Sequence, residues 1–170
     1  MDAEKRRERE EVSARSLEER FFSHVVKGPL PYHCWRWCGA VGDDGYGRFW
    51  VKDPATGKGR VFRAHRFAMQ LVMGRELSPE EFVLHRCDNP LCVKATGDDS
   101  AHLRLGDHSV NMVERSERGR SNFQALRTGS KKERAEAACS VRDAVLAGGY
   151  DHVLVQRFVR ELDEGQETLF

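Results

Sequence analysis

The run VLHRCDNPLCV, residues 83–93, brings an imidazole and two thiols into one short segment. Cys87 and Cys92 are separated by four residues, a spacing that allows both thiolates to clamp one metal ion. Five cysteines without a secretory signal argue against a disulfide framework. The segment therefore predicts a metal-binding loop, and zinc, which prefers sulfur and imidazole ligands, is the first candidate.

A closed zinc site needs four protein ligands, so the loop requires further residues from elsewhere in the chain. His102 downstream and Cys34 upstream complete a Cys3His set, although Cys38 can replace Cys34. Because Cys38 lies beside two tryptophans in the run WRWC, the alternative interpretation is a buried core thiol. Four protein ligands leave no position for a substrate, so we expect one structural Zn²⁺ that ties distant parts of the chain together.

His85 is then left without a metal-binding role, and its position beside a rigid loop suits a general base. A neutral imidazole can take a proton from water near neutral pH, and a backbone carbonyl on its other nitrogen would fix the tautomer. Asn111 offers a carboxamide oxygen, which can hold Mg²⁺ together with waters and phosphate oxygens. Taken singly, His85 can be a core or capping histidine and Asn111 a helix-start residue. Together they predict metal-assisted cleavage of phosphodiesters.

Length and composition describe one domain with extensions. The chain has 170 residues, of which 39% are hydrophobic and 32% are charged. This length supports one modest core but not two independent ones. No apolar run is long enough to span a bilayer or to form a signal peptide. We therefore expect a cytoplasmic protein without a membrane partner.

Basic side chains gather in two stretches, although the net charge is only +1. Residues 58–75 contain no acid, and residues 115–134 carry an excess of arginine and lysine. Such stretches can follow the phosphates of a nucleic acid, or they can simply solvate helix surfaces. Their position beside a metal motif favours nucleic acid.

Hydrophobic spacing and turn residues predict the elements that position these side chains. Residues 1–20 are expected to be a charged helix or tail, and a capping box of Ser16 and Glu19 starts a short helix that Gly28 and Pro29 stop. The next elements are two hairpin strands around Gly45 and Gly57, a helix at 64–72, a strand entering His85, a helix from Asp107 or Ser109 to Gly119, and a helical pair split by Gly148 and Gly149. Residues 21–120 thus form the expected central domain, and 121–170 a linker, a helical extension and a tail.

Six short motifs occur in an order that resembles a known family. They are CWRW, GYGRF, RAHRFAMQLVMG, LHRCDNPLC, HLRLG and NMVERSERGR, within about residues 20–120. As an ordered set they are similar to the HNH (His-Me finger) homing-type endonucleases with a zinc-binding loop, which are related to the His-Cys box enzymes. The resemblance implies an α+β fold with a ββα-metal core, a structural zinc loop and helical N- and C-terminal extensions.

The resemblance also implies roles for single residues. His85 matches the histidine that activates water, Asn111 matches the magnesium ligand, and Arg48 of GYGRF matches an arginine offered to DNA near the scissile phosphate. The residues that match the structural zinc ligands are Cys34, Cys87, Cys92 and His102. Two departures stand out, because the run VKATGDDSA lengthens the loop before His102, and Val110 occupies a position where an acid commonly precedes the asparagine.

These observations predict a DNA endonuclease with a histidine base and a single Mg²⁺, or another divalent ion. Basic side chains would hold double-stranded DNA by its phosphates, and they are Arg48, Lys58, Arg60, Arg63 and Arg120. One alternative is a non-catalytic, zinc-stapled DNA-binding or regulatory protein, and another is a zinc-stapled protein-interaction domain. The sequence leaves open whether one or both DNA strands are cut and whether two chains form a homodimer.

The final residues, GQETLF, follow an acidic segment and end in two apolar side chains. Gln166, Leu169 and Phe170 resemble the short peptides by which bacterial DNA-processing proteins bind the replication sliding clamp. The alternative is that Leu169 and Phe170 dock on the chain's own last helix, around Val155 and Phe158. A clamp partner would place the protein in a bacterial or phage-infected cell.

Overall fold

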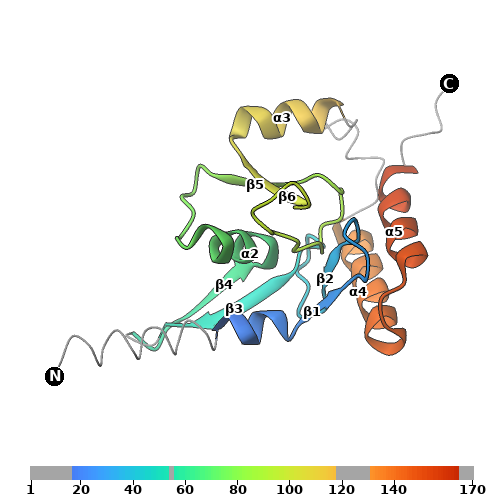
Figure 1. Cartoon of the computed structure of the whole chain (residues 1–170), viewed down its shortest axis with the longest axis horizontal. Helices are drawn as coiled ribbons and strands as arrows, with labels where there is room; N and C mark the ends of the chain where they lie inside the picture. The colour runs from blue at the N-terminus through green and yellow to red at the C-terminus, as the bar shows by residue number, and fades with distance from the viewer. Residues whose placement is uncertain (1–16, 54–55, 118–130, 165–170) are drawn as a thin grey trace.

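The computed structural model describes residues 17–53, 56–117 and 131–164. Short antiparallel strand pairs and helices make up this part of the chain, which confirms the predicted α+β class (Figure 1). The elements are β1 (Val25–Lys27), β2 (Trp35–Trp37), β3 (Arg48–Lys52), β4 (Gly59–Arg63), α2 (Ala64–Met73), β5 (Phe82–His85), β6 (Leu103–Gly106), α3 (His108–Glu117), α4 (Lys131–Gly148) and α5 (His152–Glu164). Within the described residues the strands pair two by two, as β1–β2, β3–β4 and β5–β6.

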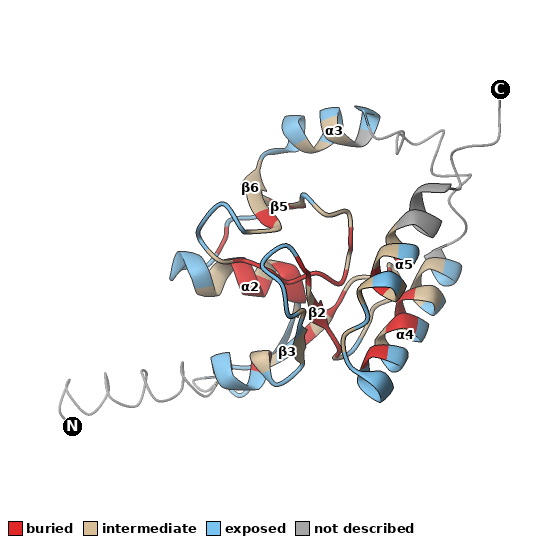
Figure 2. Cartoon of the chain, turned by 45° about the vertical axis from the view of Figure 1, so that its right-hand side comes forward, coloured by how far each residue is buried: buried red, intermediate tan, exposed pale blue. Residues whose placement is uncertain are grey.

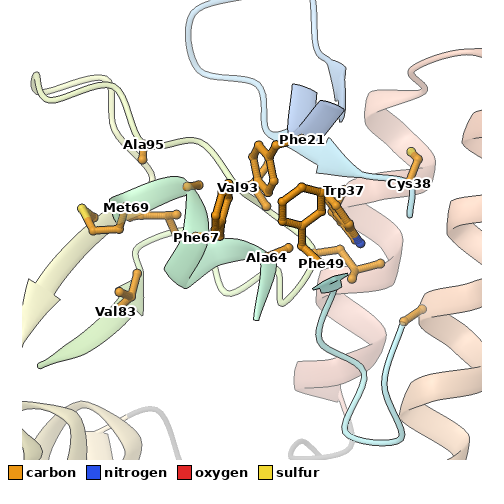
Figure 3. Close-up of a cluster of buried hydrophobic side chains, with 14 of the residues drawn as sticks. Phe21, Trp37, Cys38, Phe49, Ala64, Phe67, Met69, Val83, Val93 and Ala95 are labelled. Carbon is orange, nitrogen blue, oxygen red and sulfur yellow. The ribbon is translucent and has the colours of Figure 1, made fainter. Parts of the chain in front are cut away.

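Aromatic rings from four elements form the centre of the core (Figure 3). Phe21 comes from a helical stretch at residues 17–22, and its ring centre lies 5.1 Å from the ring centres of Trp37 and Phe67. Phe49 of β3 lies 4.7 Å from Phe67 of α2. Burial of these large rings holds the N-terminal helical stretch, β2, β3 and α2 together.

The N-terminal helix is shorter than the sequence predicts. It ends at Phe22, and the residues that were expected to continue it toward Gly28 form β1 instead. β1 pairs with β2 so that Val25 lies opposite Trp37. Adjacent β-branched valines beside a tryptophan-rich strand favour sheet pairing, and this tertiary contact outweighs the helical spacing. The predicted capping residue Ser16 lies outside the described residues.

β3, β4 and α2 match the predicted hairpin and helix. Arg48 of β3 lies opposite Arg63 of β4, and the hairpin turn contains Gly57 with φ of 69°. α2 begins directly after β4 and ends at Gly74, whose φ of 63° is the left-handed conformation that favours glycine. The second residue of α2, His65, belongs to its buried face.

β5, β6 and α3 form a strand–strand–helix unit. The segment that joins the two strands, residues 86–102, contains Cys87, Cys92 and His102 and is called the metal loop. The two strands pair antiparallel, with His85 opposite Leu103. Asp107 caps α3, because its Oδ1 accepts a hydrogen bond from the N–H of Val110 at 2.8 Å. α3 lies at the outer edge of the molecule, and most of its described side chains are exposed (Figure 2).

α4 and α5 pack against each other and against the body of the molecule (Figures 1 and 2). Ala138, Val145, Val155 and Phe158 are buried in the same hydrophobic cluster as the central aromatic rings. The predicted break between the two helices is present, with Gly149 at φ of 83°. None of the helices described is both long and apolar enough to cross a bilayer.

Candidate metal centre and candidate active site

Four side chains from separate segments converge in one cluster. The ligand atoms of Cys34, Cys87, Cys92 and His102 all lie within 4.8 Å of one another. Nδ1 of His102 lies 3.5 Å from Sγ of Cys34 and 3.6 Å from Sγ of Cys92. In a tetrahedral site with Zn–S of about 2.3 Å and Zn–N of about 2.0 Å, sulfur and nitrogen lie about 3.5 Å apart. The cluster can therefore hold a metal ion such as zinc.

Backbone contacts fasten the metal loop to its surroundings. The N–H of Arg86 donates to the carbonyl of His102 at 2.8 Å, which joins the two ends of the loop. Cys92 lies opposite Arg36 of β2 in an isolated β-bridge. Asp88 has φ of 55°, the one left-handed non-glycine residue in the described part of the chain, and it turns the backbone between the two loop cysteines. The ligands are thus positioned by β2, β5 and β6 together.

The three thiols of the cluster shift one another's pKa values in opposite directions. The pKa of the Cys34 thiol is held far below its usual range, because Cys87 and Cys92 donate hydrogen bonds to it. The hydrogen bond with Cys34 raises the pKa of Cys87 to about 12, and burial raises the pKa of Cys92. Since the thiolate is the ligand form, a bound cation would stabilise the cluster with all three protons removed.

Cys38 lies outside the cluster. Its Sγ donates to the backbone carbonyl of Arg36 at 3.6 Å, and burial raises the pKa of the thiol. The structure therefore places Cys34 among the four converging side chains and leaves Cys38 as a core thiol. Cys139 is half-buried in α4.

His85 ends β5, and its ring is fixed against the metal loop. Its Nε2 donates a hydrogen bond to the carbonyl of Cys92 at 3.0 Å. Because a carbonyl oxygen can only accept, Nε2 carries the proton and Nδ1 carries the lone pair of the neutral ring. Burial lowers the pKa of His85 to about 4, so the ring is neutral at pH 7. A ring in this state can accept a proton at Nδ1.

Two rings that the sequence analysis did not single out pack around His85. The ring centre of His65 lies 4.9 Å from that of His85, and the ring centre of Tyr46 lies 6.2 Å from it. His65 is buried, and its Nδ1 has no hydrogen-bond partner among the residues that the structure describes. Burial, and then the neighbouring His85, lower the pKa of His65 well below its usual value. The guanidinium of Arg63 lies 5.0 Å from the centre of the Tyr46 ring, so these rings connect His85 to the β3–β4 hairpin.

Asn111 lies half-buried in the first turn of α3. Phe82 is opposite Gly106 in the β5–β6 pair, and the ring centre of His108 lies 5.7 Å from that of Phe82. α3 therefore begins beside Phe82, the first residue of β5, whereas His85 is the last residue of that strand. The structure places His85 and Asn111 on one strand–strand–helix unit, with α3 leaving at the end of β5 opposite His85.

The basic residues of the β3–β4 hairpin divide between its two faces. Arg48 and Arg63 lie opposite each other, and each forms a 2.9 Å ion pair with Asp44. Arg60, three residues before Arg63, points to the other face and pairs with Glu76 at 3.3 Å. Arg48 and Arg63 therefore share one face of the hairpin, and Arg60 lies on the other face.

The remaining predicted contact residues fall at the hairpin turn or outside the described residues. Lys58 is exposed just before β4. Arg120 and the tail residues Gln166, Leu169 and Phe170 belong to segments that the structure does not describe. Binding to a sliding clamp therefore stays a prediction.

Comparison with known proteins reveals two phage proteins of similar sequence. The chain is 34% identical over 89 residues to Protein 2.8 of Escherichia phage T7, covering 52% of this chain and 53% of that protein. It is 35% identical over 83 residues to Protein 7.7 of the same phage, covering 47% of this chain and 55% of that protein. The chain thus spans about half the length of these curated relatives. No family model and no solved structure matches it.

Proposed function

We propose that the chain is a metal-dependent DNA endonuclease of the His-Me finger kind, with β5, β6 and α3 as its ββα-metal core. The observation that carries this proposal is the hydrogen bond from Nε2 of His85 to the carbonyl of Cys92, 3.0 Å long. This contact fixes the tautomer that a general base needs and joins the base to the metal loop. The similarity to phage T7 proteins supports a role in a phage-infected cell.

In the proposed reaction Nδ1 of His85 accepts a proton from water, and the water oxygen attacks the phosphorus opposite the leaving 3′ oxygen. Asn111, with its hard carboxamide oxygen, would hold a divalent cation whose remaining ligands are waters and phosphate oxygens. When bound, such a cation would neutralise the negative charge that develops on the leaving 3′ oxygen. In-line attack separates nucleophile and leaving group, so His85 and Asn111 act from opposite sides of the phosphodiester.

The β3–β4 hairpin supplies the proposed DNA-binding surface. Arg48 and Arg63 share one face, and Tyr46 and His65 connect this face to His85. Trp50 and Val61 lie opposite each other on the same face, with 51% and 58% of their surface exposed. Arginines can pair with phosphates, and exposed apolar side chains can contact sugars or thymine methyl groups. This surface would orient the duplex for the attack.

A plasmid assay tests the proposal. Wild-type protein with Mg²⁺ should convert supercoiled plasmid to nicked or linear DNA, and His85→Ala should reduce the rate at least about 100-fold, the usual contribution of a positioned base. DNA binding, measured by gel shift without Mg²⁺, should be unchanged. His24→Ala, which removes an exposed histidine beside Trp37, is the matched control and should cleave at the wild-type rate.

Two outcomes would overturn the proposal. Cleavage by His85→Ala at the wild-type rate would remove the histidine from the reaction. DNA binding by wild-type protein without any Mg²⁺-dependent cleavage would favour the non-catalytic, zinc-stapled DNA-binding protein instead.

A further inference from the structure

Arg36 is a buried cation without a carboxylate partner. The residue is 0% exposed, and its guanidinium packs 4.8 Å from the centre of the Phe158 ring. Nη1 donates to Oδ1 of Asn89 at 3.1 Å, but Nε and Nη2 find no hydrogen-bond partner in the described part of the chain. Within the described residues no aspartate or glutamate forms an ion pair with it. Burial of an unpaired charge in a protein interior is strongly unfavourable, so a compensating negative charge near Arg36 would stabilise the fold.

Backbone pairing places Arg36 beside the metal centre. Arg36 lies directly opposite Cys92 in an antiparallel bridge, and directly opposed residues project from the same face. Cys34, another member of the cluster, is two residues before Arg36. The neutral amide of Asn89, within the metal loop, accepts from the N–H of Leu91 at 3.0 Å as well as from Arg36. The guanidinium is therefore held to the loop by a group that cannot neutralise it.

A filled metal centre would supply the missing negative charge. Three thiolates and one neutral imidazole around a divalent cation carry a net charge of minus one, from three negative charges and two positive charges. We infer that Arg36 is the counter-cation of the metal-bound Cys3His centre, and that the guanidinium and the metal–thiolate centre stabilise each other's burial. The metal without Arg36, or Arg36 without the metal, leaves one unpaired charge in the core.

Zinc affinity, measured by competition with a chromophoric chelator, tests this inference without reference to DNA cleavage. Arg36→Met keeps an unbranched side chain but removes the charge, and it should weaken zinc binding about 10- to 100-fold, the range found for groups that support metal ligands. Arg36→Lys keeps the charge and should recover most of the affinity. Arg60→Met, at an exposed arginine of β4, should bind zinc like the wild type.

A change in the net charge of the metal centre tests whether Arg36 acts through its charge or through its packing. Cys87→His would convert the ligand set to Cys2His2, whose net charge with zinc is zero. Arg36→Met should then weaken zinc binding much less in the Cys87→His background than in the wild-type background, which a double-mutant cycle measures as coupling.

Three results would overturn the inference. The first is an equal loss of affinity on Arg36→Met in both backgrounds, and the second is unchanged zinc affinity in Arg36→Met. The third is failure of both Arg36→Met and Arg36→Lys to fold with zinc present, because that result would show that the shape of the guanidinium, and not its charge, is required. If only Arg36→Met fails to fold, the requirement for charge is supported.

Discussion

The two polar sites of this protein share one loop but differ in how they are closed. The Cys3His cluster joins Cys34, just before β2, to three residues between β5 and β6, and Cys34 and Cys92 are almost completely buried. His85 is half-buried at the end of β5, and the rings of His65 and Tyr46 connect it to Arg63 of the β3–β4 hairpin. A closed set of four ligands can fix structure but admits no substrate, whereas the proposed function requires that DNA reach His85. The proposed function therefore assigns a structural role to the Cys3His cluster and a reactive role to the site around His85.

Cys92 belongs to both sites, and the two sites depend on each other unequally through it. Its thiol belongs to the metal cluster, and its carbonyl accepts the hydrogen bond from His85. Loss of the metal should therefore displace His85, while removal of the His85 ring should leave the metal in place. Each variant below tests one side of this asymmetry.

The largest effect is expected at the metal centre. Cys34→Ala should lose bound zinc and unfold at ordinary temperature, because structural zinc binding contributes roughly 10–16 kcal/mol and is coupled to folding. Cys38 directly follows β2 and lies outside the cluster. Cys38→Ala should therefore retain one zinc per chain. Metal analysis and thermal unfolding of both variants check this contrast. Well-folded, zinc-free Cys34→Ala protein would show that the cluster is not a structural centre.

Asn111→Ala should separate cleavage from folding. The variant should lose at least about 100-fold in cleavage rate, because the proposed cation loses its protein ligand and the leaving oxygen loses electrostatic stabilisation. The free energy of unfolding should change little, since the side chain is half-buried in the first turn of an exposed helix. Rates measured against Mg²⁺ concentration, together with thermal unfolding, give both quantities. A wild-type rate at low Mg²⁺ would exclude Asn111 as the ligand.

The two faces of the β3–β4 hairpin should differ in DNA binding. Arg63→Met should weaken binding and reduce the slope of log affinity against log salt concentration by about 1, as expected for loss of one phosphate contact. Arg60→Met, on the opposite face, should change neither quantity. Fluorescence anisotropy at several salt concentrations measures both variants. Equal effects would mean that DNA does not select the Arg63 face.

The smallest effect concerns pH and His65. Its pKa in the folded chain lies below the unfolded value of about 6.5, so the unfolded chain binds more protons and stability falls as pH drops below that value. The loss for one such group is at most about 1.4 kcal/mol per pH unit. His65→Phe should show a shallower decline than the wild type between pH 6.5 and 5.5 in denaturant unfolding. Parallel curves would mean that His65 is not buried in its neutral form.

Local spacing predicted the elements whose signals lie within a few residues. Gly74 ends α2, and Gly148 and Gly149 separate α4 from α5, because glycine punctuation acts on the local backbone. The N-terminal helix was predicted too long, since Val25 and Val26 gain a strand partner in β2 that lies beyond the helix signal. β6 did not emerge as a separate strand, because its pairing with β5 bridges the long metal loop.

The metal cluster was predictable because its ligand types are distinctive. Cysteine and histidine in the run around Cys87 and Cys92 indicate a metal even before the fold is known. The choice between Cys34 and Cys38 required the structure, since both flank β2 and only pairing of that strand with the loop decides which thiol faces the cluster. His65 and Arg36 could not be singled out, because a helix histidine and a strand arginine resemble ordinary surface residues until burial is known.

The most direct measurement follows zinc and magnesium in one sample. Purified protein carrying one zinc per chain is incubated with supercoiled plasmid while Mg²⁺ is titrated, and zinc content is measured before and after the reaction. The division into a structural and a reactive site predicts no cleavage without Mg²⁺, cleavage that rises with added Mg²⁺, and zinc that stays bound throughout. Folded protein without zinc, or cleavage that is absent at every Mg²⁺ concentration, would contradict it.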